Sequence, residues 1–306
     1  MSRVAIVKFG GAAVTNKTKK WCLEKDLLRN CCKSLAGALS SGYLANAVIV
    51  HGAGSFGHFE AKEYAIGKTV PSNKSELLHL LGGVRETRKA VKALNDAVVE
   101  GCIEHEIAAA RSDVVVSPSV PLHSQYEEAV KMTQAGLVPV MHGEVVSTFA
   151  ENRYKILSGD IIIEELCEVL APAFPTAVHE CFFISNVPGI FTKPPEEEGA
   201  ELIKEVVVSK FENDGAKMKG MSDEEIKKRI RSIELWNGTK MEGAEQLSLG
   251  GSGGTDVTGG ILSKFGSAIN IAAMGIPVLI SDSKHPVLTT IAADAPAYSY
   301  TKFSVL

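Results

Sequence analysis

The chain has 306 residues, of which 45% are hydrophobic and 22% charged, and its formal net charge is −4. This composition is typical of a globular protein with a large core, and the slight excess of acidic residues argues against nucleic acid as a partner. No apolar run is long enough to span a membrane, and the six cysteines show neither CxxC pairs nor zinc-ligand spacing, so we expect a reduced protein of the cytoplasm.

Short apolar runs alternate with amphipathic stretches along the first part of the chain. Each apolar run ends in glycine, proline or polar residues, which predicts a buried strand followed by a turn. A long helical pattern over 75–107 contains Gly82-Gly83, where we expect a kink or a break. The predicted strands lie at 4–9, 45–50, 113–118, 137–141 and 181–187, with helices at 27–39 and from 159 and a polar hairpin at 142–157.

The last third of the chain differs in character. Residues 196–255 are rich in Glu, Lys and Gly and predict a polar insertion at the edge of the fold, with one short amphipathic helix over 223–233. A helix over 258–275 and a strand over 276–281 follow. Because strands buried on both faces alternate with helices, we predict an α/β fold with a mostly parallel sheet between helical layers.

Every glycine-rich turn follows the carboxyl end of a predicted strand, where open parallel sheets bind ligands. The turn HGAGSFGH contains G-x-G-x-x-G at Gly52, Gly54 and Gly57, which also fits a dinucleotide-binding fingerprint. A fingerprint should open a helix and precede a strand that ends in an acidic residue, and here a polar stretch follows instead. We therefore favour backbone N–H groups that approach a phosphate, and the absence of a Walker A motif excludes a P-loop.

Four titratable side chains stand beside these turns, and each also has a plain structural interpretation. Lys8 ends an apolar strand, where a lysine is unfavourable unless it meets an anion or emerges from the sheet. Asp160 opens a helix, where any acid is favoured, and Lys264 lies one turn into a glycine-rich helix start suited to an anion. His58 follows the glycine-rich turn, although most lone histidines in loops are simply hydrogen-bonded there.

The order of these motifs resembles the amino acid kinase superfamily over residues 4–283. The shared motifs are Lys8-Phe9-Gly10-Gly11-Ala12, the turn after the second strand, Leu157-Ser158-Gly159-Asp160, SNVPGI at 185–190, and DVTGG at 256–260 with Lys264. Within the superfamily, Thr15-Asn16-Lys17 and GAGSFGH resemble the isopentenyl phosphate kinases, and fosfomycin kinases share much of this pattern. SNVPGI departs from the acid-rich turn of many relatives, and the insertion at 196–255 is longer than in compact ones.

The resemblance implies that ATP, with Mg²⁺, phosphorylates isopentenyl phosphate, a small isoprenoid monophosphate, in a protein that commonly forms homodimers. It implies one three-layer αβα domain over 1–306, with an acceptor lobe at about 1–175 and an ATP lobe at about 176–306. Lys8, Lys17, His58, Asp160 and Lys264 would be catalytic, with no metal ligand among them. Gly10, Gly11, Ser185, Asn186, Gly189 and Gly259 would join Lys8 and Lys264 around ATP, and Ala53, Gly54, Gly57 and Gly159 would join His58 around the acceptor.

The resemblance also implies a role for each charged group. Lys8 and Lys17 would grip the phosphates, Asp160 would hold the lysines, and Lys264 would meet ATP from the opposite side. His58 would hydrogen-bond the acceptor phosphate, and we expect Leu78, Leu81 and Val84 to line the pocket of its tail. The alternatives are a kinase of another phosphate or phosphonate such as fosfomycin, a dinucleotide-dependent oxidoreductase, and a nucleotide-binding module without catalysis.

Overall fold

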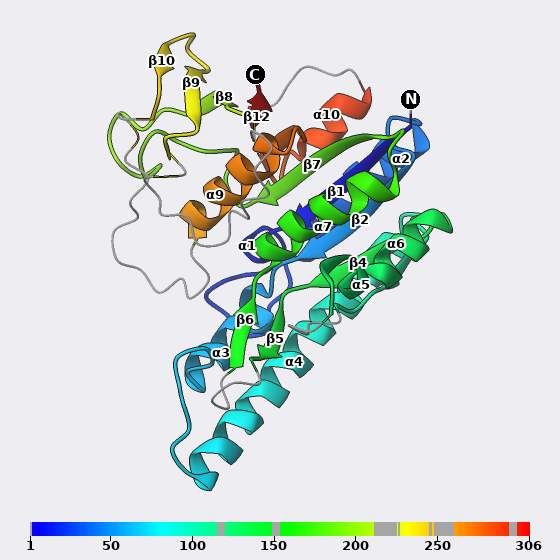
Figure 1. Cartoon of the computed structure of the whole chain (residues 1–306), viewed down its shortest axis with the longest axis vertical. Coiled ribbons are helices and arrows are strands. Elements are labelled where there is room, and N and C mark those ends of the chain that lie inside the picture. The colour runs from blue at the N-terminus through cyan, green and yellow to red at the C-terminus, as the bar shows by residue number, and fades with distance from the viewer. Residues whose placement is uncertain are drawn as a thin grey trace.

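The computed structural model describes residues 2–114, 120–148, 154–210, 225, 227–244, 247, 260–293 and 299–306. Over these residues a ten-stranded sheet lies between helices on both faces, in the order β10-β9-β8-β12-β11-β7-β1-β2-β4-β3 (Figure 1). The strands from β3 to β11 run parallel, and the pairs β11–β12, β8–β9 and β9–β10 are antiparallel. Their bounds are β1 Arg3–Phe9, β2 Asn46–His51, β3 Ala109–Arg111, β4 Val138–His142, β7 Val178–Ser185, β8 Ile203–Val208, β9 Ile230–Leu235, β10 Lys240–Glu242, β11 Val278–Asp282 and β12 Thr301–Val305.

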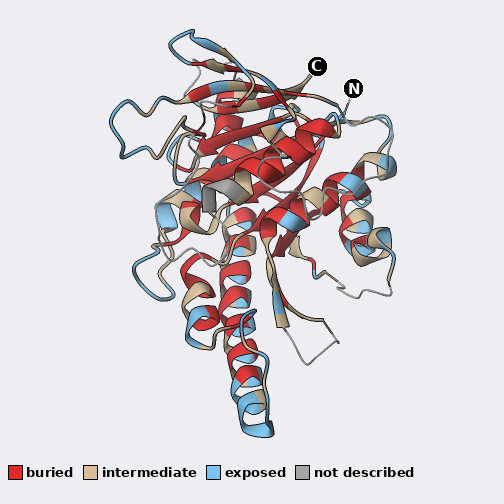
Figure 2. Ribbon diagram, turned by 60° about the vertical axis from the view of Figure 1, so that its left-hand side comes forward, coloured by how far each residue is buried: buried red, intermediate tan, exposed pale blue. Residues whose placement is uncertain are grey.

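Two hydrophobic clusters, one on each face of the sheet, hold the helices in place (Figure 2). Strand β1 is buried along nearly its whole length because it pairs with β2 on one side and β7 on the other. Its Ile6 belongs to the cluster under α7 and α9, and its Val7 to the cluster under α2 and α4. The helices are α1 Gly11–Val14, α2 Lys25–Ser40, α3 His58–Glu63, α4 Lys74–Ile103, α5 Leu122–Gln125, α6 Glu127–Gln134, α7 Gly159–Ala173, α9 Gly260–Ala273 and α10 Val287–Ala293, with a 3₁₀ turn η1 at Gly54–Phe56.

The N-terminal half of α4 extends beyond the sheet beside α3 and a separate hairpin (Figure 1). This hairpin consists of β5 (Glu144–Ser147) and β6 (Tyr154–Leu157). Arg88 of α4 holds it, since its Nη2 donates to the Val145 carbonyl at 2.6 Å and its Nε to Glu144 at 2.9 Å. A small third cluster fills the space between them and contains Ala61, Ile66, Leu80, Val84 and Val145.

Most predicted elements are confirmed within a few residues, including the hairpin and the cap of α7, where Ser158 accepts from the Ile161 N–H at 3.3 Å. The break predicted at Gly82-Gly83 is wrong, because α4 runs through it. A Cβ on Gly83 would lie 2.3 Å from the Tyr64 ring, so this glycine permits close packing instead of interrupting the helix.

Two other predictions are wrong. The third strand is Ala109–Arg111 and not 113–118, because the Asp113 N–H donates to the Glu128 carboxylate and leaves the sheet; residues 115–119 lie outside the described residues. The helix predicted over 223–233 is wrong at its end, because β9 takes Ile230–Leu235 as an antiparallel partner of β8, whereas Glu225 and Lys227 are helical. Strands β8, β9 and β10, which belong to the segment 196–255, lie at one edge of the sheet. None of the helices in the described part of the chain is long and apolar enough to cross a membrane.

Candidate active site

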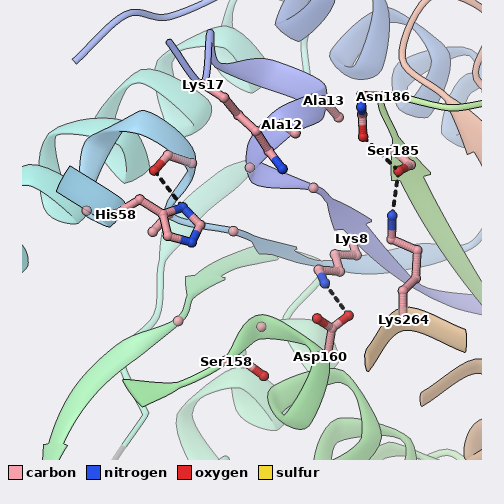
Figure 3. A pocket seen from close by; sticks show the side chains of 18 of the residues that line it. Lys8, Ala12, Ala13, Lys17, His58, Ser158, Asp160, Ser185, Asn186 and Lys264 are labelled. Carbon is pink, nitrogen blue, oxygen red and sulfur yellow. Dashed lines mark hydrogen bonds and ion pairs between the residues drawn. The ribbon is translucent and has the colours of Figure 1, made fainter. Parts of the chain in front are cut away.

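A cavity of about 350 Å³ lies at the carboxyl ends of β1, β2 and β7 (Figure 3). It is bounded by the turns that follow these strands, by the start of α7 and by the hairpin β5–β6. Of the residues predicted to form the site, those that line it are Lys8, Gly10, Gly11, Lys17, Ala53, Gly54, Gly57, His58, Gly159, Asp160, Ser185, Asn186, Gly189 and Lys264. Gly259 lies outside the described residues.

An ion pair between Lys8 and Asp160 lies at the floor of the cavity. The Lys8 Nζ donates to Asp160 Oδ1, and the two residues are only 6% and 8% exposed. Lys8 also lies over the Phe183 ring, with its Nζ 5.4 Å from the ring centroid. Because burying either charge alone would be strongly unfavourable, the pair fixes both side chains at the start of α7.

The first two glycine-rich turns are packed directly onto one another. A Cβ on Gly11 would lie 2.3 Å from the Gly54 nitrogen, and Gly54 has a positive φ of 51°. Only glycine allows both the contact and the left-handed backbone. The turns after β1 and β2 therefore form one continuous wall of backbone, with room for a phosphate to approach it.

Lys17 and His58 face the cavity from two different segments of the chain (Figure 3). The His58 Nδ1 lies 3.1 Å from the Gly54 carbonyl oxygen, four residues earlier. With the proton on Nδ1 donated to that oxygen, Nε2 lies on the opposite edge of the ring.

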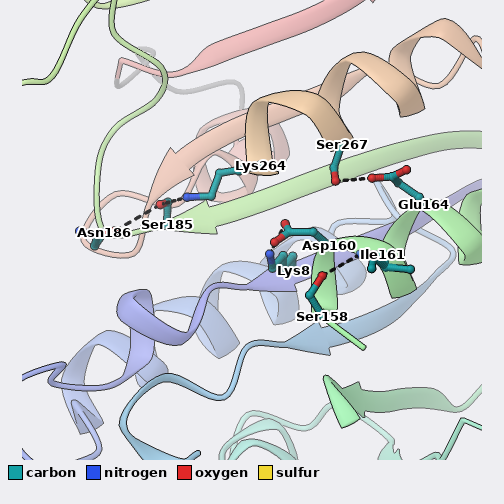
Figure 4. Close-up of polar contacts among 9 residues, drawn as sticks. All are labelled: Lys8, Ser158, Asp160, Ile161, Glu164, Ser185, Asn186, Lys264 and Ser267. Atoms are coloured by element: carbon teal, nitrogen blue, oxygen red, sulfur yellow. Dashed lines mark hydrogen bonds and ion pairs between the residues drawn. The ribbon is translucent and has the colours of Figure 1, made fainter. Parts of the chain in front are cut away.

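Lys264 closes the other side of the cavity. Its Nζ donates to Ser185 Oγ at 2.5 Å, which brings α9 to the end of β7 (Figure 4). One turn further along α9, Ser267 and Asn270 both donate to Glu164 of α7. Burial raises the pKa of Glu164, although these two hydrogen bonds act in the opposite direction. The helices that carry Asp160 and Lys264 are thus joined directly.

A network of buried polar side chains is hydrogen-bonded to the backbone of the second glycine-rich turn. His51 Nδ1 lies 3.1 Å from the Gly52 carbonyl oxygen, and the Asn95 amide lies 3.1 Å from His51 Nε2. Burial, together with the nearby His142 ring at 5.5 Å, lowers the pKa of His51 to about 3. His51 is therefore neutral, and its Nδ1–H donates to the backbone of the glycine-rich turn.

The apolar end of the cavity differs from the sequence prediction. Its lining includes Ala61, Val91, Val145 and Ile156, together with Thr87 and Arg88. Leu78, Leu81 and Val84 do not line it: Leu78 and Leu81 are exposed, and Val84 packs in the small cluster behind it. Helical spacing alone could have suggested Thr87 and Val91, but only the position of the hairpin shows which turn of α4 faces the cavity.

Comparisons with known proteins agree with this geometry. The model of the family described as "Amino acid kinase family" matches residues 3–282. The chain is 26% identical over 291 residues to isopentenyl phosphate kinase of Methanothermobacter thermautotrophicus, with 92% of this chain and 91% of the relative covered. It is 28% identical over 260 residues to isopentenyl phosphate kinase of Arabidopsis thaliana, with 80% and 66% covered.

Solved structures show the same fold. An X-ray structure of isopentenyl phosphate kinase matches with a TM-score of 0.68 at 20% identity, covering 98% of this chain and all of the other. The UMP kinase from Ureaplasma parvum matches with a TM-score of 0.54 at 10% identity, with 99% of each chain covered. The three-layer αβα architecture predicted from the sequence is confirmed.

Proposed function

Because the chain belongs to the amino acid kinase family, we propose that it transfers the terminal phosphoryl group of ATP to isopentenyl phosphate, giving isopentenyl diphosphate and ADP. One observation carries the choice of acceptor. The side chains of Lys8, Lys17, Lys264 and His58 line the cavity, and a small apolar wall of Ala61, Val91, Val145 and Ile156 lies near α4 and the hairpin. This combination matches a monophosphate with a short hydrocarbon tail.

The acceptor lies on the side formed by about residues 1–175. Its phosphate contacts the backbone of Ala53, Gly54, Gly57 and Gly159 and the Nε2 of His58. Its tail lies against Val91, Val145 and Ile156, which line the cavity near α4 and the hairpin. The nearby Arg88 is engaged with Glu144 and the Val145 carbonyl, so this end offers little to a second anionic group such as a carboxylate.

ATP lies on the side formed by about residues 176–306, where Lys264 meets its phosphates. Ser185 holds the Lys264 ammonium group in position, and Asn186 and Gly189 border the nucleotide together with Gly10, Gly11 and Gly259. An oxygen of the acceptor phosphate forms a bond to the terminal phosphorus of ATP as the bond to the leaving ADP oxygen breaks. Both substrates are anions, so the main task of the protein is to bring them together and to neutralise charge.

The charged side chains meet this requirement without a basic protein. Lys8 and Lys17 contact the phosphoryl group in transfer, and Asp160 keeps Lys8 in place through their buried ion pair. Mg²⁺ supplies further charge neutralisation at the phosphates. Among the described residues no three His, Cys, Asp or Glu side chains gather around a common point, and Asp160 is a carboxylate of the cavity wall that would hold such an ion.

The proposal is tested by steady-state kinetics with Mg·ATP and a panel of acceptors: isopentenyl phosphate, fosfomycin, acetylglutamate and UMP. We expect the highest kcat/KM for isopentenyl phosphate. A higher value for another acceptor would replace the substrate while keeping the ATP site. A homodimer and a cytoplasmic location remain predictions, which sedimentation and cell fractionation test.

A further inference from the structure

The segment that carries Lys17 is a short hairpin-like loop. Thr15 and Leu23 form an antiparallel bridge, and the Asn16 N–H donates to the Cys22 carbonyl at 2.9 Å. Within this loop Trp21 has a φ of 54°, a left-handed conformation that is unfavourable for a bulky side chain. Such a conformation persists only where surrounding contacts impose it.

The contacts that impose this backbone conformation on Trp21 come from residues 55–60, the segment that carries His58. The Trp21 N–H donates to the Ser55 carbonyl at 3.1 Å, and the indole Nε1–H donates to Glu60 Oε1 at 2.7 Å. The indole also stacks on Phe56, with ring centroids 5.8 Å apart. Ser55 exchanges two further hydrogen bonds with Cys22, at 3.1 and 3.3 Å.

The Glu60 carboxylate joins α3 to the loop that carries Lys17. It lies two residues after His58 in α3 and is only 2% exposed. Its Oε1 accepts from Trp21 and also pairs with Lys20 at 3.1 Å. A buried carboxylate requires such partners, so the loop and α3 stabilise each other.

We propose that Trp21 and Glu60 are positioning residues that lock the Lys17 loop onto the His58 helix and so fix the separation of these two phosphate-binding side chains. Neither residue lines the cavity, so both act through Lys17 and His58. This inference rests on the proposed function, because it assigns Lys17 and His58 to the reacting phosphates.

Trp21→Phe tests the lock, because it keeps an aromatic ring and removes the indole N–H. The chain offers a matched control in Trp236, which is also 38% exposed. Its Nε1–H donates to the Tyr300 carbonyl at 2.9 Å, and the two rings lie 5.8 Å apart, away from the cavity. Trp236→Phe therefore removes a comparable hydrogen bond elsewhere in the fold.

We expect Trp21→Phe to lower kcat/KM for isopentenyl phosphate about tenfold, the effect of losing one hydrogen bond to a charged group, while the KM for ATP stays within about twofold. Trp236→Phe should change neither. In a Lys17→Ala background Trp21→Phe should cost less than about twofold, because Trp21 acts through Lys17. Glu60→Gln, which still accepts from Trp21, should retain more activity than Glu60→Ala.

Hydrogen exchange of the ligand-free protein provides a readout that does not depend on the substrate. Trp21→Phe should accelerate exchange in residues 15–24 and 54–63, and Trp236→Phe should not. Unchanged exchange in these segments, or a full additional loss in the Lys17→Ala background, would overturn the inference. If the wild-type protein does not phosphorylate isopentenyl phosphate, the proposed substrate is wrong, and the exchange experiment still decides whether the lock exists.

Discussion

Lys8 at the end of β1 donates a hydrogen bond to Asp160 in the first turn of α7, although 152 residues separate them in the chain. Both side chains are buried, and both line the cavity. The pair therefore links the centre of the sheet to the helix that borders the cavity. Because Asp160 is the partner of Lys8, substituting both residues separates the effect of Lys8 on catalysis from its effect on stability.

Lys8→Met should lower kcat at least about 100-fold, because a charge that stabilises the transferring group is lost. It should also lower the unfolding free energy by about 3 kcal/mol, since Asp160 is left buried without its partner. Adding Asp160→Asn should restore much of the stability and none of the activity. Kinetics and urea unfolding of the single and double variants check this, and recovery of turnover in the double variant would show that Lys8 has only a structural role.

His58→Ala should lower kcat/KM for the acceptor about 100-fold and leave the KM for ATP nearly unchanged, because in the proposed function the Nε2 contact serves only the acceptor phosphate. His105→Ala is a suitable control. Like His58, His105 has its Nδ1 close to the carbonyl oxygen four residues earlier, at 2.8 Å against 3.1 Å, but His105 lies just past the C-terminal end of α4 and does not line the cavity. Equal losses in the two variants would remove His58 from the acceptor site.

Lys264→Ala should reduce kcat/KM for ATP about 100-fold, because the charge proposed to meet the nucleotide phosphates is removed. Ser185→Ala should reduce it only a fewfold, since it removes one hydrogen bond that orients the ammonium group. The two variants are compared with wild type at a saturating concentration of the acceptor. An equal loss in Ser185→Ala would mean that the serine contacts ATP itself and does more than orient Lys264.

His51 gives a pH dependence of stability. Its pKa is about 3 in the folded protein against an ordinary value of 6.5, because the ring is buried near His142. The unfolded chain therefore binds more protons between these values, and the unfolding free energy falls as the pH drops from 6.5 toward 3, by up to about 1.4 kcal/mol per pH unit. Above that window His51 contributes no pH dependence.

Urea unfolding between pH 4 and pH 8 measures this effect when wild type is compared with His51→Asn. The asparagine amide can still donate to the Gly52 carbonyl, and it does not titrate. We expect the variant to lose part of the acid sensitivity of the wild type. Identical slopes in both proteins would mean that another group sets the acid limit of stability.

Local patterns predicted much of the sheet, and the site residues named from those patterns and from the family resemblance line the cavity wherever the structure describes them. Apolar runs that end in glycine mark the carboxyl ends of parallel strands, and such ends meet at one edge of a sheet. Where a sequence pattern allowed more than one local structure, contacts between segments distant in the chain determined which structure formed. Glu128 draws Asp113 out of the sheet, and Tyr64 uses Gly83 as a packing surface.

The resemblance implied that Asp160 holds the lysines, and the structure pairs it with Lys8. The other partners could not be predicted from the sequence, because the pairing of Lys264 with Ser185 and of Trp21 with Glu60 depends on how segments far apart in the chain come together. The position of Arg88 on the hairpin likewise decides which turn of α4 faces the acceptor. Sequence spacing contains no information on these distances.

Phosphorus NMR of the purified protein with Mg·ATP and isopentenyl phosphate tests the central claim most directly. The account predicts that the monophosphate signal disappears as two coupled diphosphate signals and those of ADP grow together. Parallel samples with fosfomycin, acetylglutamate or UMP should remain essentially unchanged. An unchanged isopentenyl phosphate signal, with turnover of another acceptor, would contradict the assignment.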